Sequence, residues 1–278
     1  MKKNERAAAI VRTIVVSLIA VLFVVPLVWM LLSSLKTAPE VFARPFHWLP
    51  AKAQWQNYAT VWMNEEASML RAFANTLYIA LFSIVGQMFI SSLAAYSFAK
   101  INFKGKQVVF MLFLSSMMVP SQLTIIPRFM LFKTIGLYNN LWAIILPAFF
   151  GATSIFMLRQ FYMGLPNDLI EAAKIDGASD HEILFKIKLP MVMPSVTICT
   201  FLTLTNSFKL FDQNVALTAG EPANASEMLA LNIYNTFYGR SGAQWKGIGQ
   251  AKAVIFFLIV VVISMIQLHF TRSKEVQQ

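Results

Sequence analysis

The chain has 278 residues, of which 57% are hydrophobic and 13% are charged, and its mean hydropathy is +0.60. A soluble domain usually carries about 25% charged residues, so this composition excludes an ordinary soluble fold and indicates a polytopic membrane protein. The formal net charge of +10 does not predict nucleic-acid binding, because basic residues in a membrane protein mostly set its orientation and contact anionic lipid.

Apolar segments close to the length of a spanning helix recur along the chain. A helix needs about 20 mostly apolar residues to cross the hydrocarbon core of a bilayer. Six segments fit this requirement: residues 14–32, 74–98, 108–126, 141–158, 191–211 and 253–268. The sequence therefore predicts an all-α polytopic membrane protein with six transmembrane helices, organised as a single transmembrane domain over residues 1–278.

The distribution of lysine and arginine predicts the orientation. An even number of spans places both termini on one side, and basic residues gather in the cytoplasmic segments near span ends. The short connection that holds Lys100, Lys104 and Lys106 is the clearest such segment. We therefore expect both termini in the cytoplasm and two long extracytoplasmic loops, at residues 36–71 and 212–252. Residues 226–238 of the second loop have the pattern of a short amphipathic helix.

Prolines occur inside several predicted spans, at Pro26, Pro120, Pro127, Pro147 and Pro194. Membrane helices tolerate proline when neighbouring groups satisfy the freed carbonyls. We expect ordinary kinks at these positions; hinges or an opened central path are the alternative.

The connection between the fourth and fifth predicted spans, residues 164–190, is polar and helix-forming. Asp168 with Glu171, and Ser179 with Glu182, have the spacing of capping boxes, and Gly177 between them can end a helix in a left-handed conformation. We predict a hairpin of two short helices, followed by the fifth span beginning at a proline. A surface that docks another protein and an amphipathic helix lying on the membrane explain this hairpin equally well.

The hairpin contains Glu171-Ala172-Ala173, followed without a gap by Asp176-Gly177-Ala178. With Arg159, Phe161 and Pro166 before it and Leu189-Pro190 after it, this pattern resembles the EAA motif of bacterial ABC-importer permeases. It is most similar to the second, shorter subunit class of the maltose-type carbohydrate permeases. The resemblance covers essentially the whole chain, and the segment LFDQNVALTAGEPANASEMLALNIYNTFYGR is similar to the multiple-sugar, raffinose or melibiose branch.

The resemblance implies a type I ABC-importer permease fold in the bacterial cytoplasmic membrane, with a cytoplasmic coupling hairpin seated in a cleft of an ATPase subunit. The coupling residues would be Glu171, Ala172, Ala173, Asp176, Gly177 and Ala178. It also implies a homologous second permease subunit, two ATPase subunits that hold ATP and Mg²⁺, and an extracytoplasmic sugar-binding protein. The loop before the last span would contact that binding protein, through Thr218, Gly220, Glu221 and Pro222.

Polar side chains on the fifth predicted span are candidate contacts for a carbohydrate, which is neutral and rich in hydrogen-bonding groups. They are Thr203, Asn206 and Ser207. Hydrogen bonds between helices explain them equally well, and the partner permease alone would hold the sugar in some relatives.

The sequence lacks a phosphate loop of the form G-x-x-x-x-G-K-S/T, so we expect no ATP hydrolysis and no cofactor on this chain. An ATP-independent secondary transporter or channel is the alternative function. The central parts of the predicted spans contain no Asp or Glu, and this argues against an ion-coupled carrier, which often places such a residue in the membrane.

Overall fold

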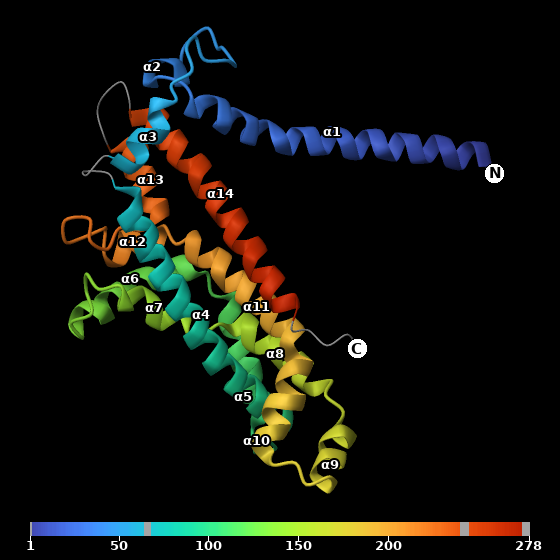
Figure 1. The fold of residues 1–278 in the computed structure, drawn as a ribbon. Helices are drawn as coiled ribbons and strands as arrows, with labels where there is room; N and C mark the ends of the chain where they lie inside the picture. Colours follow the sequence, from blue (N-terminus) through green and yellow to red (C-terminus); the bar gives the residue numbers. More distant parts are fainter. Residues whose placement is uncertain (1, 64–67, 240–244, 274–278) are drawn as a thin grey trace. The chain divides into compact units, whose positions relative to one another are not determined.

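The structure, a computed structural model, describes residues 2–63, 68–239 and 245–273. Every regular element in these ranges is a helix (Figure 1). Two compact units contain them: one comprises residues 1–69 and 232–258, and the other residues 70–231 and 259–278. Five helices of the described ranges are long and apolar enough to cross a membrane, and a bent helix pair makes a sixth candidate. Parts of both predicted long loops, residues 64–67 and 240–244, lie outside the described ranges.

The first unit begins with the longest helix, α1 (Lys2–Ser34), followed by α2 (Ala38–Val41) and α3 (Gln56–Met63). It also holds most of α13 (Leu229–Tyr238) and the first half of α14 (Trp245–Arg272). Both α1 and α14 extend beyond the predicted spans. The apolar window of α1 is 0% buried, as expected of a helix whose side chains face lipid or another subunit.

The segment after α1 contains a buried lysine that packs against an aromatic ring of α1. Lys36 is 1% exposed, and its ammonium lies 4.7 Å from the ring centroid of Trp29. Burial lowers the pKa of the Lys36 side chain, and the nearby Glu40 carboxylate partly opposes this. Asn57 of α3 donates from Nδ2 to the carbonyl oxygens of Ser34 and Lys36, at 2.8 and 3.2 Å. The predicted loop at residues 36–71 is thus tied to the end of α1 by buried polar contacts.

Within the same unit, α13 packs closely on α14. A Cβ at Gly249 would lie 2.9 Å from Phe237 Cβ, so only glycine permits this approach. Lys252 is fully buried and donates to Asn232 Oδ1 at 2.7 Å and Thr236 Oγ1 at 2.8 Å. The predicted amphipathic helix is present, although it begins at Leu229 instead of residue 226.

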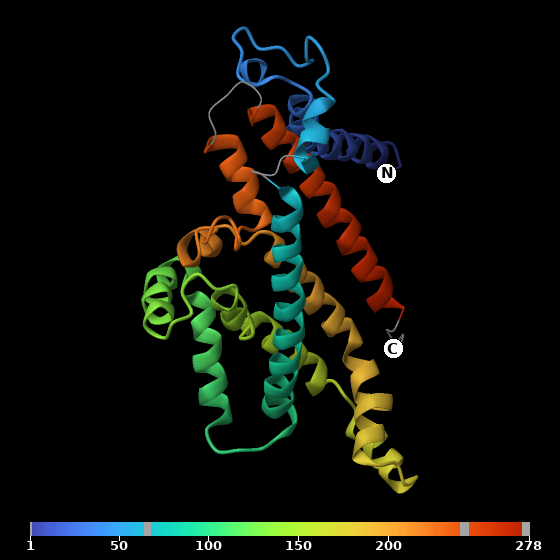
Figure 2. The same ribbon diagram turned by 60° about the vertical axis from the view of Figure 1, so that its left-hand side comes forward.

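The second unit carries the candidate sites. Its helices, in chain order, are α4 (Met69–Lys100), α5 (Lys106–Ser115), η2 (Ser116–Met118), α6 (Ser121–Thr134), α7 (Trp142–Ala148), α8 (Ala152–Met163), α9 (Asn167–Ile175), α10 (Asp180–Glu182), the π-helical segment η3 (Ile183–Lys188), α11 (Leu189–Phe208) and α12 (Asp212–Leu217). Figures 1 and 2 show α4 running beside α8 and α11. Ala95, Leu158, Val192 and Cys199 from these three helices form one buried cluster.

The third predicted span, residues 108–126, is wrong as a single helix. The chain bends by 99° between Lys106–Met118 and Ser121–Thr134. Proline disfavours the α conformation in the preceding residue, and Val119, before Pro120, is extended at φ −81° and ψ 116°. Pro120 therefore ends the first helix instead of kinking it. Pro127, by contrast, lies inside α6.

Candidate functional site

The hairpin (residues 166–188) is closed by local backbone bonds. Gly177 has φ +85°, in the left-handed region that glycine adopts without strain. Its N–H donates to the Lys174 carbonyl at 3.1 Å, and the Ala178 N–H donates to the Ala173 carbonyl at 2.9 Å. This is a Schellman motif. Ser179 then caps the next helix with its hydroxyl and receives the side chain of Glu182 in return, as the capping-box spacing predicts.

Two details of the predicted hairpin are wrong. Pro166, not Asp168, is the N-cap of α9, and no side-chain cap is present there. The amide oxygen of Asn167 is engaged elsewhere, because it accepts from Lys100 Nζ at 2.9 Å. The second short helix does not end before Pro190 either: Asp180–Phe208 is one 29-residue helix. The π-helical turn Ile183–Lys188 precedes Pro190, where the missing proline N–H disrupts regular α-helical bonding.

Most of the predicted coupling residues lie on the surface of the hairpin. Glu171, Ala172, Asp176 and Gly177 are exposed, whereas Ala173 and Ala178 are half-buried. Helix α9 buries none of its side chains, and Ile175 is 87% exposed. The ion pairs among the described residues are Lys174 with Asp180 and Lys186 with Glu182, and neither uses Glu171 or Asp176. The motif thus leaves two carboxylates and a large aliphatic side chain exposed at the surface.

Basic side chains form hydrogen bonds between α4 and the residues that precede the hairpin. Lys100 Nζ donates to the Leu165 carbonyl at 2.9 Å. Arg159 Nε donates to the Phe98 carbonyl at 3.2 Å, and its guanidinium lies 4.1 Å from the Phe110 ring centroid. From the sequence, Lys100 is an orientation signal and Arg159 belongs to the EAA pattern, because nothing in their local sequence indicates the carbonyls they reach.

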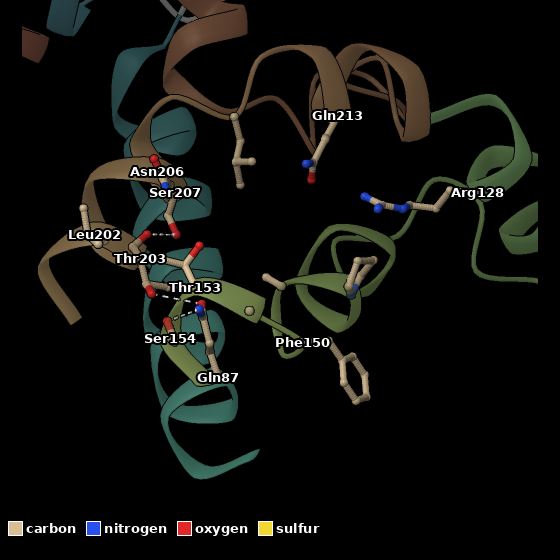
Figure 3. Close-up of a pocket in the computed structure, with 14 residues that line it drawn as sticks. Gln87, Arg128, Phe150, Thr153, Ser154, Leu202, Thr203, Asn206, Ser207 and Gln213 are labelled. Atoms are coloured by element: carbon tan, nitrogen blue, oxygen red, sulfur yellow. Dashed lines mark hydrogen bonds between the residues drawn. The ribbon is translucent and has the colours of Figure 1, made fainter. Parts of the chain in front are cut away.

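A polar pocket of about 470 Å³ lies in the second unit (Figure 3). The three predicted substrate residues Thr203, Asn206 and Ser207, all on α11, line it. The other polar residues at its wall are Gln87, Arg128, Thr153, Ser154 and Gln213, and these come from α4, α6, α8 and α12. These five residues were not predicted, because nothing in the sequence indicates that their positions converge on α11.

The three predicted residues have different hydrogen bonds. Thr203 Oγ1 lies 2.9 Å from Gln87 Oε1 on α4 and 2.8 Å from the Cys199 carbonyl of its own helix. Ser207 Oγ donates to the Thr203 carbonyl at 2.8 Å. Asn206 is exposed, and no hydrogen bond of its side chain is found among the described residues. The interhelical explanation therefore fits Thr203, whereas Asn206 lines the pocket without such a bond among the described residues.

Gln87 of α4 bonds to both α8 and α11, close to the break between α7 and α8 at residues 149–151. Its Nε2 donates to Ser154 Oγ at 2.7 Å, and a Cβ at Gly151 would collide with that same nitrogen. Similarly, a Cβ at Gly86 would collide with the Phe149 ring. The two glycines therefore permit the contacts that place Gln87 at the wall of the pocket.

The 218–228 loop contains the residues predicted to contact a binding protein. Glu221 and Pro222 are exposed, whereas Thr218 is 1% exposed and Gly220 is buried. The chain here needs several left-handed conformations, at Ala219, Gly220, Ala223 and Asn224. The exposed tip is therefore formed by residues 221–225, and Thr218 points into the protein.

Asn214, which the sequence analysis missed, holds this loop in place. It is fully buried and donates from Nδ2 to Thr218 Oγ1 at 2.8 Å and to the Ser226 carbonyl at 2.9 Å. Its Oδ1 accepts from the Met228 N–H at 3.0 Å. Asn75 of α4 adds bonds from Nδ2 to the carbonyls of Ala225 and Glu227, at 2.8 and 2.9 Å.

Apolar spanning helices, a polar pocket among them and an exposed hairpin define an integral membrane protein of the permease class. Residues 87–276 match the family of binding-protein-dependent transport system inner membrane components, and the chain belongs to this family.

Relatives in this family resemble the chain over different lengths. It is 33% identical to the diacetylchitobiose uptake system permease protein of Streptomyces coelicolor, over 85% of this chain and 79% of that protein. A shorter stretch is 51% identical to a probable starch degradation products transport system permease protein of Thermoanaerobacterium thermosulfurigenes, and it spans 41% of this chain and 38% of that relative.

A solved crystal structure has the same fold. It is that of a bacterial ABC transporter involved in the import of the acidic polysaccharide alginate. The TM-score is 0.79 at 20% identity, and the match covers 95% of this chain and 96% of that one. The predicted family and the all-α type I permease fold are thus confirmed.

Proposed function

We propose that this chain is the transmembrane permease subunit of an ATP-driven importer of carbohydrates, in particular oligosaccharides. The observation that carries the proposal is the exposed hairpin, whose EAA pattern lies at the surface of a chain that belongs to the binding-protein-dependent permease family. The relatives named for starch degradation products and diacetylchitobiose support a carbohydrate substrate.

The hairpin couples this subunit to a separate ATPase. Glu171 and Asp176 offer carboxylates to cations on the ATPase, and the small Ala172, Ala173 and Ala178 side chains permit a close approach. Gly177 makes the turn. ATP and Mg²⁺ are held by two copies of that ATPase, and this chain holds no cofactor.

Helix continuity offers a path from the hairpin to the pocket. Asp180–Phe208 is a single helix, so a movement of the hairpin is passed directly to Thr203, Asn206 and Ser207. At about 1.5 Å per residue, Thr203 lies about 35 Å along the axis from Asp180. Closure of the ATPase dimer would thus open the pocket outward, and hydrolysis would reset the inward-facing state.

The 218–228 loop receives the extracytoplasmic sugar-binding protein through Glu221 and Pro222, with buried Thr218 and Gly220 supporting the loop from within. A homologous second permease subunit completes the path through the membrane. The hairpin and both termini are cytoplasmic, the loops at residues 36–71 and 212–252 are extracytoplasmic, and residues 1–278 act as one permease domain in the bacterial inner membrane.

Purification of the tagged chain from its native membrane in mild detergent tests this function. We expect an ATPase and a second permease to copurify, and the complex with its binding protein to take up labelled maltotriose or chitobiose only when ATP is supplied. The double variant Glu171→Ala, Gly177→Val should insert normally yet lose the ATPase. A chain that purifies without an ATPase and moves solute without ATP would instead be a secondary carrier.

A further inference from the structure

Arg128 is the one charged residue that lines the polar pocket among the described residues. It comes from α6, the second half of the bent helix pair, and Figure 3 shows its guanidinium pointing across the cavity toward Gln213 and the side chains of α11. No Asp or Glu is found at the described wall of the pocket. The pocket therefore has a net positive charge.

The guanidinium has little compensation from the described part of the chain. Its Nη2 lies 3.5 Å from Thr124 Oγ1, at the limit of a hydrogen bond. The two ion pairs found in the described ranges lie in the hairpin and do not involve it. A cation within a membrane-spanning segment is costly and is usually balanced by a partner or marks a substrate path.

The wall of the pocket that faces Arg128 carries amide side chains that can form hydrogen bonds with the hydroxyls of a sugar. Neither Asn206 nor Gln213 has a side-chain hydrogen bond to another described residue, and Figure 3 shows both at the edge of the cavity, with Gln213 pointing into it. Each amide supplies an acceptor oxygen and two N–H donors, which suits a polyol. The cation and these amides together match a ligand that carries both an anionic group and hydroxyls.

We propose that this pocket binds an acidic saccharide, whose carboxylate pairs in a bidentate manner with Arg128 while Asn206 and Gln213 hold neighbouring hydroxyls. The inference rests on the proposed function and adds the charge of the sugar. A neutral sugar could accept hydrogen bonds from the guanidinium but would leave the positive charge of Arg128 unbalanced. A carboxylate balances that charge and also accepts two parallel N–H bonds from the planar guanidinium. The names of similar proteins leave this open, since they include starch products and the acidic polysaccharide alginate.

Uptake by the complete transporter in proteoliposomes, with its binding protein and ATP, tests the assignment. The probes are trisaccharides of galacturonate, mannuronate and glucuronate, each paired with its uncharged methyl ester, and maltotriose as a neutral sugar. We expect the wild type to take up at least one acid at least tenfold faster than its ester. Arg128→Gln should reduce that uptake at least tenfold and change ester uptake less than twofold.

Two further variants separate charge from folding. Arg128→Lys keeps the charge but loses the planar fork, so it should retain part of the preference for the acid. Lys133→Gln removes a positive charge from an exposed position of the same helix, and it should leave both uptake rates unchanged. The yield of assembled complex is measured for every variant.

Uptake of neutral sugars alone by the wild type would overturn this inference and leave the proposed function intact. An equal loss of acid and ester uptake in both Arg128 variants would also overturn it, because Arg128 would then pair with a partner subunit or a lipid phosphate. Absence of ATP-dependent uptake of any probe would contradict the proposed function itself.

Discussion

The hairpin and the 218–228 loop are both proposed contact sites for other proteins, yet they are built in opposite ways. The turn of the hairpin is closed by hydrogen bonds between residues no more than five positions apart, such as those of Gly177 and Ser179. The 218–228 loop depends on Asn75 and Thr76, which lie about 150 positions earlier in the chain. A local motif exposes its side chains to a partner, whereas long-range buried bonds fix the position of a loop tip.

This difference predicts which property, coupling or stability, a substitution at each site will change. A change at the hairpin should alter coupling while the helices stay folded, because α9 buries no side chain. A change beneath the 218–228 loop should instead lower the stability of the second unit, because the bonds that hold the loop are buried. Four substitutions test this contrast.

Replacement of Asn214 should have the largest effect on stability. Asn214→Leu keeps the branched shape of the side chain but removes bonds to the Thr218 hydroxyl, the Ser226 carbonyl and the Met228 N–H. The Thr218 hydroxyl keeps its bond to the Asn214 carbonyl, so two buried groups are left unsatisfied, and at about 1–3 kcal/mol each they should cost about 2–6 kcal/mol. Thermal unfolding in detergent and hydrogen exchange of residues 218–228 measure the loss. Val215→Ala, at an exposed neighbour, serves as the control and should have little effect.

A single buried hydroxyl on α4 should have the next largest effect. Thr76 is fully buried, and its Oγ1 accepts from the Leu229 N–H at 3.0 Å. Thr76→Val preserves the shape and leaves that N–H unsatisfied, so we expect a loss of about 1–3 kcal/mol and faster exchange at Leu229. Thr76→Ser retains the hydroxyl. Equal destabilisation by both variants would mean that packing of the methyl group, and not the hydrogen bond, is important.

Gly177→Val should strain the turn of the hairpin. No atom lies within 4 Å of a Cβ built at Gly177, so the penalty comes from the φ of +85° alone, about 1–2 kcal/mol for an L-residue. ATP-driven uptake should fall at least tenfold while thermal stability of the helices is unchanged. Asn tolerates the left-handed region, so Gly177→Asn should keep most of the uptake.

Gly105 provides a matched control for this experiment. It also has a positive φ, +80°, and no atom lies within 4 Å of its built Cβ, but it lies outside the hairpin. Gly105→Val should therefore impose similar strain and leave uptake largely intact. Comparable losses of uptake in both valine variants would show that Gly177 has no special role in coupling.

Ser179→Ala should have the smallest effect. It removes the hydroxyl that accepts from the Glu182 N–H at 3.3 Å, and loss of an N-cap costs about 1 kcal/mol. We expect faster hydrogen exchange confined to residues 180–185. Ser179→Asp keeps a capping oxygen and should restore protection. Exchange that spreads into α11 after Ser179→Ala would show that the cap also stabilises the spanning helix.

Local signals explain which parts of the fold the sequence predicted well. The spans at residues 74–98 and 191–211 correspond closely to Met69–Lys100 and Leu189–Phe208, because the length of an apolar run is enough to define them. Asp168 failed as a cap because the helix begins one residue earlier, at Asn167 after the N-cap Pro166. The Asn167 side chain bonds to Lys100 instead of capping the helix. That contact joins positions 67 residues apart, which no local pattern reveals.

The sequence alone determined the membrane class, the apolar segments, the left-handed turn at Gly177 and the cap at Ser179, because hydropathy and backbone conformation are properties of neighbouring residues. Tertiary structure decided which proline breaks the third span, with a 99° bend at Pro120 and a continuous helix through Pro127. It also decided the burial of Asn214 and the meeting of Gln87, Arg128 and Gln213 with α11. Burial and convergence depend on how distant segments pack, and a polar residue looks the same in sequence whether it supports a loop or lines a pocket.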